Sequence, residues 1–162
     1  MQMINSLNQE VDRKLEFIRK TLTETKTIAL RLRGTDWFAW ATAGGSNTVL
    51  LTAETGVAEI LITTENAFVL TDEIEVQRLQ DEEIPDNFQM HIYPWADVAQ
   101  REAFVKQMTG GGNVMCDRPN ATEMPIAPSL KSRKQTMMSS ELERYRRVGR
   151  LASEAMTEVL SA

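Results

Sequence analysis

Residues 57–71 read Val-Ala-Glu-Ile-Leu-Ile-Thr-Thr-Glu-Asn-Ala-Phe-Val-Leu-Thr, and this stretch decides the class of fold. Two β-rich runs, 57–63 and 67–71, are separated by a polar Glu-Asn pair that is typical of a turn. A third β-rich run, 47–52, precedes them and is joined to them through 53–56. The pattern predicts an antiparallel meander of three strands, with a hairpin between the first two.

The chain before this stretch predicts a helix, a strand and a second, shorter helix. The first helix is indicated by apolar residues at three- and four-residue steps, namely Leu7, Val11, Leu15, Ile18 and Leu22. Residues 27–32 are short and apolar with partial alternation, which favours a strand that Gly34 breaks. Thr35 or Asp36 then begins a short helix that is expected to end before Gly44.

Helices and strands alternate in the chain after the meander. A helix is expected over 72–84 and a strand over 88–93. Another helix follows Asp97, ends at a run of three glycines, and leads to a last short strand at 113–116. This order predicts an α/β fold, a sandwich with a mixed central sheet and helices on its faces.

Three regions are expected along the chain: an α/β domain at 1–117, a connector at 118–139 that contains three prolines, and a helix at 140–162. Ser140 and Glu143 form a capping box at the start of that helix. An apolar stripe runs along it through Leu142, Tyr145, Val148, Gly149, Ala152, Ala155, Met156, Val159 and Leu160. No Gly, Asn or Pro stops the helix, so we expect the stripe to cover part of a missing C-terminal domain.

Composition limits the classes of partner. At 162 residues the chain is expected to form one domain, and its net charge of −5 argues against binding nucleic acid or anionic lipid. Cys116 is the single cysteine, so no internal disulfide can form and a reducing, cytoplasmic location is expected. No signal peptide and no apolar run of membrane-spanning length is present in the sequence.

A search for catalytic or ligand-binding patterns yields no strong candidate. His91 is the single histidine, and a partly exposed sheet residue is the favoured interpretation over a ligand or a base for Cys116. The glycine clusters at 44–46 and 110–112 lack the spacing of a phosphate-binding loop and are better explained as helix ends. The carboxylates at 81–83 are best explained as a solvated helix end.

The short helix near residue 37 contains the most distinctive surface candidates. Trp37 and Trp40 lie three residues apart, so both can face the same way, and Arg31 and Arg33 lie just before them. One interpretation is that one or both tryptophans pack on the sheet, which is the more common case. The other is an aromatic wall at an interface, where Trp and Arg are favoured.

Several segments resemble the creatinase, aminopeptidase P and prolidase family. Residues 131–134, Lys-Ser-Arg-Lys, followed by the pattern of the last helix, are similar to the linker helix of that family; the matching positions are Glu141, Arg144, Arg147, Ala152, Glu154, Ala155 and Met156. Residues 36–40, 44–52 and 67–72 are similar to successive parts of the N-terminal domain of the family. The resemblance implies a three-layer, ribonuclease-H-like α/β sandwich with a mixed sheet, followed by a C-terminal linker helix.

The resemblance also implies a function. The chain would be the non-catalytic N-terminal domain of an Xaa-Pro aminopeptidase- or dipeptidase-like metallopeptidase, and alone it would hydrolyse no peptide. Two divalent metals, Mn, Co or Zn, would be bound by Asp, His and Glu in the missing pita-bread domain, and no metal ligand is assigned to this chain. A homodimer is expected, in which residues 37–47 help to shape the substrate pocket of the partner. The candidate residues for that interface are Arg33, Trp37, Trp40, Ser46 and Asn47.

Two other functions stay open. A pita-bread protein that has lost catalysis would use this domain within a protein-binding module. The C-terminal sequence distinguishes the two, since an active peptidase retains its Asp, His and Glu ligands. A self-contained α/β enzyme is the third possibility. The lack of a catalytic constellation argues against it, and a ligand bound in a pocket lined by His91 and Cys116 would favour it.

Overall fold

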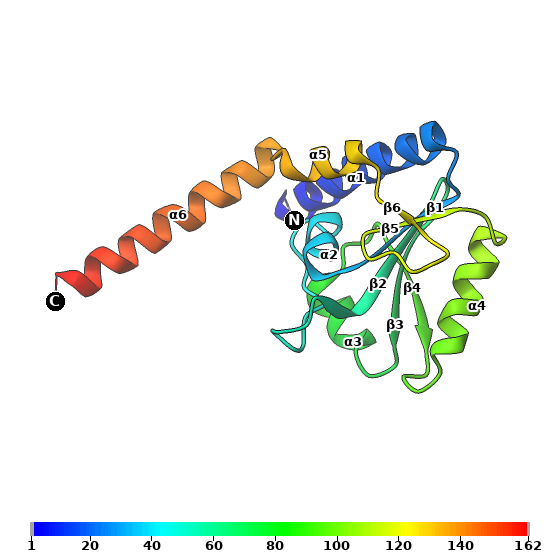
Figure 1. Cartoon of the computed structure of the whole chain (residues 1–162). Coiled ribbons are helices and arrows are strands. Elements are labelled where there is room, and N and C mark those ends of the chain that lie inside the picture. Colours follow the sequence, from blue (N-terminus) through cyan, green and yellow to red (C-terminus); the bar gives the residue numbers. More distant parts are fainter. Residues whose placement is uncertain (1, 162) are drawn as a thin grey trace. The chain divides into compact units, whose positions relative to one another are not determined.

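The computed structural model describes the backbone of residues 2–161 and the side chains of residues 7–161. Its centre is a six-stranded mixed sheet with the order β4-β3-β2-β1-β5-β6 (Figure 1). The strands are β1 (Ala29–Gly34), β2 (Thr55–Thr63), β3 (Ala67–Asp72), β4 (Gln89–Tyr93), β5 (Val114–Cys116) and β6 (Met124–Pro125). The pairs β1–β2 and β2–β3 are antiparallel, whereas β3–β4, β1–β5 and β5–β6 are parallel.

Helices cover both faces of this sheet. The helical segments are α1 (Gln2–Thr25), α2 (Thr35–Ala41), α3 (Val76–Arg78), the π-helical turn η1 (Leu79–Glu83), α4 (Val98–Thr109), α5 (Pro128–Gln135) and α6 (Ser139–Leu160). Because side chains alternate along a strand, Ile60 and Ile62 of β2 pack with α1 and α2, whereas Leu61 packs with α4. The three-layer α/β sandwich with a mixed sheet is therefore confirmed.

The meander differs from the prediction in one strand. Segments 57–63 and 67–71 do form neighbouring antiparallel strands, but the third strand of the meander is β1. Residues 47–52 form no strand, so the predicted hairpin is wrong. The physical reason is that β1 occupies the free side of β2, which leaves 47–52 without a strand to pair with.

Two other segments are more structured, or less regular, than the sequence indicated. The stretch 118–139, expected as a connector, contains the short strand β6 and the helix α5. The helix expected over 72–84 is shorter and changes from α3 into a π-helical turn at Leu79.

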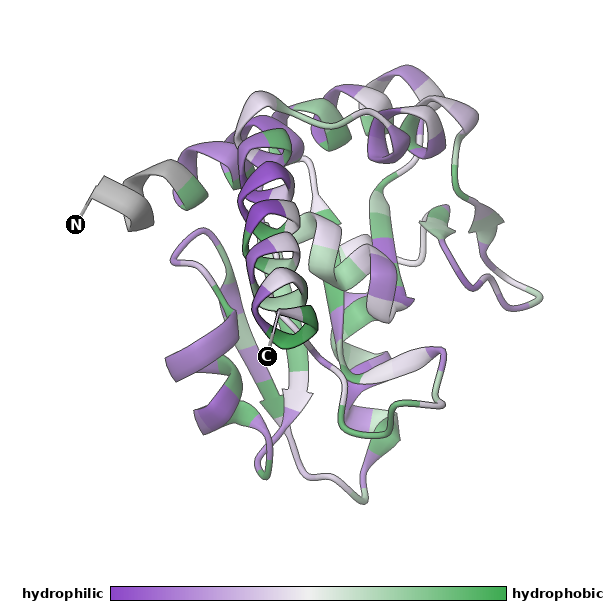
Figure 2. Cartoon of the chain, turned by 90° about the vertical axis from the view of Figure 1, so that its left-hand side faces the viewer, coloured by the Kyte–Doolittle hydropathy of each residue, from purple (hydrophilic) through white to green (hydrophobic). Residues whose placement is uncertain are grey.

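The chain divides into two compact units, Met1–Lys131 and Ser132–Ala162. In the second unit, apolar and polar positions alternate around α6 (Figure 2), and none of its residues is buried. The helix begins at Ser139, so the expected Ser140–Glu143 capping box is wrong in register. Instead, the backbone N–H of Met138 donates to Glu141 Oε2 at 2.7 Å. None of the helices among the described residues is long and apolar enough to cross a membrane.

Candidate functional site

The two tryptophans of α2 lie in the core. Trp37 is 9% exposed and Trp40 is 8% exposed. Their rings meet edge to face, with centroids 5.6 Å apart and planes at 84°. Of the two interpretations, the one in which both tryptophans pack on the sheet is therefore confirmed. Neither side chain forms an exposed aromatic wall. They instead hold α2 against the sheet.

A buried lysine ties the end of α2 to α1. Lys14 Nζ donates to Trp40 O and to Glu10 Oε1, each at 2.7 Å. The side chains of Lys14 and Glu10 are both only 1% exposed. A cation placed at the carbonyl end of a helix is favourable, and here it also lies 5.3 Å from the Trp40 ring centroid. The point where the chain leaves α2 is thus fixed by α1.

The segment after α2 is fixed to the body of the domain through residues 45–47, which we call the loop base. Asn47 is fully buried, and its Nδ2 donates to Ala58 O of β2 at 2.7 Å. The N–H of Ser46 donates to Glu83 Oε2 at 2.7 Å, which links the loop base to η1. A side chain at Gly56 would lie only 2.1 Å from Asn47 Cγ, so the close approach of β2 to the loop base requires glycine there.

Beyond this base the chain projects into solvent with three consecutive apolar residues, Val49, Leu50 and Leu51, which we call the loop tip (Figure 1). They are 61%, 65% and 92% exposed. The Ala53 N–H donates to Leu50 O at 3.0 Å and closes a turn at the tip. Three adjacent exposed apolar side chains on a fixed base are typical of a contact surface. The sequence analysis had predicted that these residues form part of a strand, and so did not identify them as an exposed surface. The signal against a half-buried strand was that apolar and polar residues do not alternate here.

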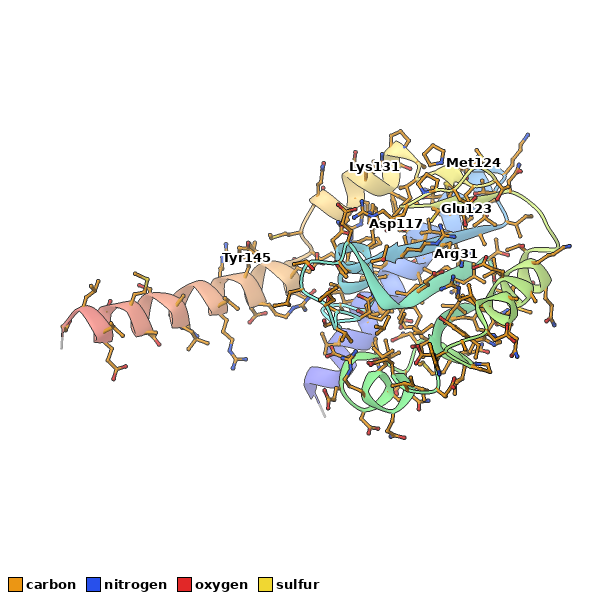
Figure 3. All side chains as sticks on the ribbon, turned by 60° about the horizontal axis from the view of Figure 1, so that its bottom comes forward. Arg31, Asp117, Glu123, Met124, Lys131 and Tyr145 are labelled. Atoms are coloured by element: carbon orange, nitrogen blue, oxygen red, sulfur yellow. The ribbon has the colours of Figure 1, made fainter. Side chains whose placement is uncertain are left out.

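Arg33 belongs to a different structure on the α4 face of the sheet. Six side chains there form what we call the charge cluster: Arg31, Arg33, Glu59, Arg101, Glu102 and Glu123. Arg33 binds Glu123 through both terminal nitrogens, at 2.6 and 2.7 Å. Arg31 donates a hydrogen bond from Nε to Glu59 Oε2 at 2.6 Å, and from its two terminal nitrogens to Glu102 at 2.8 and 2.6 Å. Figure 3 labels Arg31 and Glu123 of this cluster, together with Asp117.

The charged groups of this cluster are paired with one another and hold neighbouring elements together. The hydrogen bonds from Arg31 lower the pKa of Glu102 to about 2, so this carboxylate stays charged at neutral pH. Asp117, at the adjoining end of β5, accepts from the backbone N–H groups of Arg33 and Gly34 at 2.8 and 2.7 Å. The cluster therefore joins β1 and β2 to α4 and to the loop before β6, and it leaves Arg33 engaged rather than free.

The two residues of the possible nucleophilic dyad lie far apart. His91 is on β4 and Cys116 on β5, and three strands separate β4 from β5 in the sheet. At a strand spacing of about 4.8 Å, that is roughly 19 Å. Burial raises the pKa of the Cys116 thiol to about 12, so the thiol is protonated and unreactive. His91 is a partly exposed residue of β4, as expected. Its ring also stacks on Phe104, with centroids 3.6 Å apart, which the sequence did not predict. The pocket lined by both residues does not exist.

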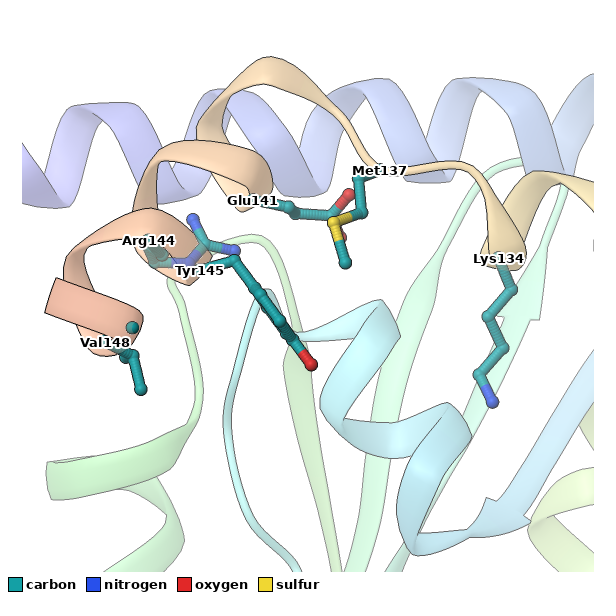
Figure 4. Close-up of a pocket in the computed structure, with 7 residues that line it drawn as sticks. Lys134, Met137, Glu141, Arg144, Tyr145 and Val148 are labelled. Atoms are coloured by element: carbon teal, nitrogen blue, oxygen red, sulfur yellow. The ribbon is translucent and has the colours of Figure 1, made fainter. Parts of the chain in front are cut away.

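No group of three or more His, Cys, Asp or Glu residues is placed to hold a metal ion within the part of the chain that the structure describes. The second unit has a surface hollow, shown in Figure 4. It is lined by Lys134, Met137, Glu141, Arg144, Tyr145, Val148 and Gly149. Its lining mixes charged and apolar groups and contains no pair of side chains typical of catalysis.

Comparisons with known proteins agree on the fold. No protein-family model and no curated protein matches the chain. Among solved structures, it is similar to an Xaa-Pro dipeptidase from Bacillus anthracis, with a TM-score of 0.67 and 15% identity over 93% of this chain and 43% of that one. It is also similar to a prolidase from Pyrococcus horikoshii OT3, with a TM-score of 0.66 and 16% identity over 90% of this chain and 41% of that one.

A third similar structure is of domain size. It is an aminopeptidase P from Streptococcus thermophilus, with a TM-score of 0.54 and 14% identity, and the match covers 78% of this chain and 98% of that one. The chain thus has the fold found in Xaa-Pro dipeptidase, prolidase and aminopeptidase P structures, as its resemblance implied. It spans less than half the length of the dipeptidase and prolidase chains.

Proposed function

We propose that this chain is the non-catalytic N-terminal domain of an Xaa-Pro aminopeptidase- or dipeptidase-like metallopeptidase of the cytoplasm. The observation that carries the proposal is the coverage of the structural match: 93% of this chain aligns with only 43% of the Bacillus anthracis dipeptidase. A chain that matches a peptidase structure over less than half its length corresponds to a part of it. Two divalent metals and their Asp, His and Glu ligands would belong to a following pita-bread domain.

The role proposed for this part is to form a dimer contact and to restrict which peptides enter the partner's active site. The loop tip supports it, because its apolar side chains are exposed while the loop base is held by Ala58 and Glu83. Among the interface candidates, Ser46 and Asn47 hold the loop base, Trp37 and Trp40 hold α2, and Arg33 stays within the charge cluster. We therefore propose that Leu50 and Leu51 are the residues that restrict peptide entry at the partner's active site.

The first experiment assays residues 1–162 alone with Xaa-Pro dipeptides and tripeptides in the presence of Mn, Co or Zn. We expect no turnover above the buffer, since no catalytic constellation is assigned to this chain. Turnover that a chelator abolishes would overturn the proposal. The gene sequence beyond residue 162 supplies a second test. Retained Asp, His and Glu ligands support a peptidase, whereas their loss supports the protein-binding module.

The access role is tested by Leu51→Ser in the longer protein. Removing the apolar tip should change the ratio of kcat/KM for a tripeptide to that for a dipeptide several-fold, because the two substrates differ in how far they extend from the active site. Ile74→Ser is the matched control, since Ile74 is also an exposed apolar residue, at 66%, but lies outside the loop. An equal ratio in all three proteins would contradict the role of the tip.

A further inference from the structure

The sheet ends in an open edge at β4. This strand pairs with β3 alone and is the last strand on its side of the sheet. Its five residues, Gln89–Tyr93, include no Pro, Lys or acidic residue. Edge strands that stay unpaired in solution are usually protected by such residues, by bulges or by a covering segment. The opposite edge strand, β6, shows the contrast, because it has only two residues and one is Pro125.

The direction of the backbone groups on β4 follows from its pairing. Tyr93 O accepts from Glu73 N, next to the partner residue of Tyr93 on β3, so Tyr93 directs its backbone groups toward β3. Alternate residues of a strand direct theirs to opposite sides. The backbone N–H and C=O groups of Gln89 and His91 therefore also point to β3. Those of Met90 and Ile92 point to the open edge.

We propose that β4 pairs antiparallel with β4 of a second copy of this chain, about a two-fold axis at His91. In that register Met90 lies opposite the partner's Ile92, and Ile92 lies opposite the partner's Met90. Every outward N–H and C=O of the two strands is then satisfied, in four hydrogen bonds. A register centred on Ile92 would set Met90 opposite a proline, the partner's Pro94, which has no N–H to donate.

The side chains favour a second copy over an unrelated extended peptide. Met90 packs against the core on the α1 face, and Ile92 shares that face and is 48% exposed. The two-fold register places these apolar side chains directly opposite each other twice, which is the arrangement that stabilises paired strands. Such a contact is isologous, so it closes at two copies and leaves no further edge of this kind open. The inference rests on the dimer part of the proposed function and names the strand that forms the contact.

Cysteine cross-linking tests the register directly. At the two-fold axis, His91 faces the partner's His91 in a non-hydrogen-bonded pair with a Cα–Cα distance of about 4.5 Å. This lies within the range that a disulfide spans. His91→Cys should therefore form a covalent dimer under mild oxidation. Gln89→Cys is the matched control on the same face of β4. Its symmetry mate lies four residues along the strand, about 13 Å away, so it should stay uncross-linked.

A sedimentation experiment covers the case in which the cysteine variants fold poorly. Ile92→Lys adds a charge at a half-exposed position whose backbone N–H and C=O point away from β3, so it should fold and raise the dimer dissociation constant at least tenfold. Ile92→Thr, which keeps the backbone donor and the β-branch, should still dimerise. Equal cross-linking of both cysteine variants, or no cross-linking of a folded His91→Cys protein, would overturn the inference. A wild-type dimer that Ile92→Lys leaves intact would also overturn it, while the proposed domain function would stand. Chelator-sensitive peptidase turnover by this chain would refute that function and leave the β4 contact unaffected.

Discussion

On the α1 face of the sheet the contacts are mainly apolar apart from the buried Lys14–Glu10 pair, whereas the α4 face combines a small apolar core with the charge cluster. Val11, Leu15, Ile18 and Leu22 of α1 are at most 3% exposed and pack on the alternating residues of β1 and β2. On the other face, Arg31 is 1% exposed and makes its hydrogen bonds to carboxylates on β2 and α4. Apolar burial is non-directional, but the arginine contacts require a fixed donor geometry. The two faces should therefore respond differently to substitution.

The largest loss of stability is expected from Arg31→Ala. It leaves Glu59, which is 7% exposed, without its closest cation and removes both hydrogen bonds to Glu102. Breaking a buried ion pair in this way costs about 3–5 kcal/mol of unfolding free energy. Arg31→Lys should lose most of the same amount, because an ammonium cannot reproduce the planar fork. Urea unfolding measures both, with the exposed Arg13→Ala as a control that should change stability by less than about 0.5 kcal/mol.

On the α1 face the response should follow side-chain volume. Ile18 is fully buried against the sheet, so Ile18→Ala should lower the unfolding free energy by about 2–5 kcal/mol, and Ile18→Val by about 0.5–1.5 kcal/mol. The two faces would not differ in this way if Ile18→Val cost as much unfolding free energy as Ile18→Ala, or if Arg31→Lys were as stable as the wild type. Both pairs can be measured by the same urea titration.

The α1 face was predictable from the sequence, and the charge cluster was not. A helical apolar period and β-rich runs are local patterns, so α1, β2, β3, β4 and α4 were all expected near their observed positions. The carboxylates that hold the two arginines of β1 are 28, 71 and 90 residues away along the chain. No local pattern links residues so distant, and the sequence showed only that Arg31 and Arg33 lie close together just before Trp37.

The candidate site shows the same limit. The glycines and polar residues after α2 marked the end of a helix, and the buried tryptophans were one of the two expected outcomes. The loop tip was misassigned because Val49 and the threonines at 48 and 52 are residue types enriched in strands. What decides its structure is a non-local fact, namely that β1 already occupies the side of β2 that 47–52 would need.

A smaller effect on stability is expected at Glu102, the most exposed carboxylate of the charge cluster, and this effect depends on pH. Arg31 lowers the pKa of Glu102 from 4.5 to about 2. The unfolded chain therefore binds more protons at this site between those values, so the stabilisation is present above pH 4.5 and is lost as pH falls toward 2. Glu102 is 46% exposed, so Glu102→Gln should cost only about 1 kcal/mol at neutral pH.

The measurement is the melting temperature at pH 7, 4 and 3. The wild type should lose stability faster than Glu102→Gln over this range, so the two curves should converge at the acid end. Glu82→Gln, at an exposed carboxylate on η1, is the control and should run parallel to the wild type. Curves of Glu102→Gln and wild type that stay parallel would mean that the Arg31 contact is not maintained in solution, and the charge cluster would then contribute little to the α4 face.

The smallest effect on stability is expected at the loop tip, which belongs to neither face. Leu51 is 92% exposed, so Leu51→Ser removes no buried contact and should change the unfolding free energy by less than about 0.5 kcal/mol. This distinguishes a contact surface from a structural one. A side chain whose removal leaves the unfolding free energy unchanged has no role in holding the domain together. If Leu51→Ser costs as much as Ile18→Val, the tip is part of the core in solution. The change in peptide selectivity proposed for this residue could then not be attributed to contact with a partner.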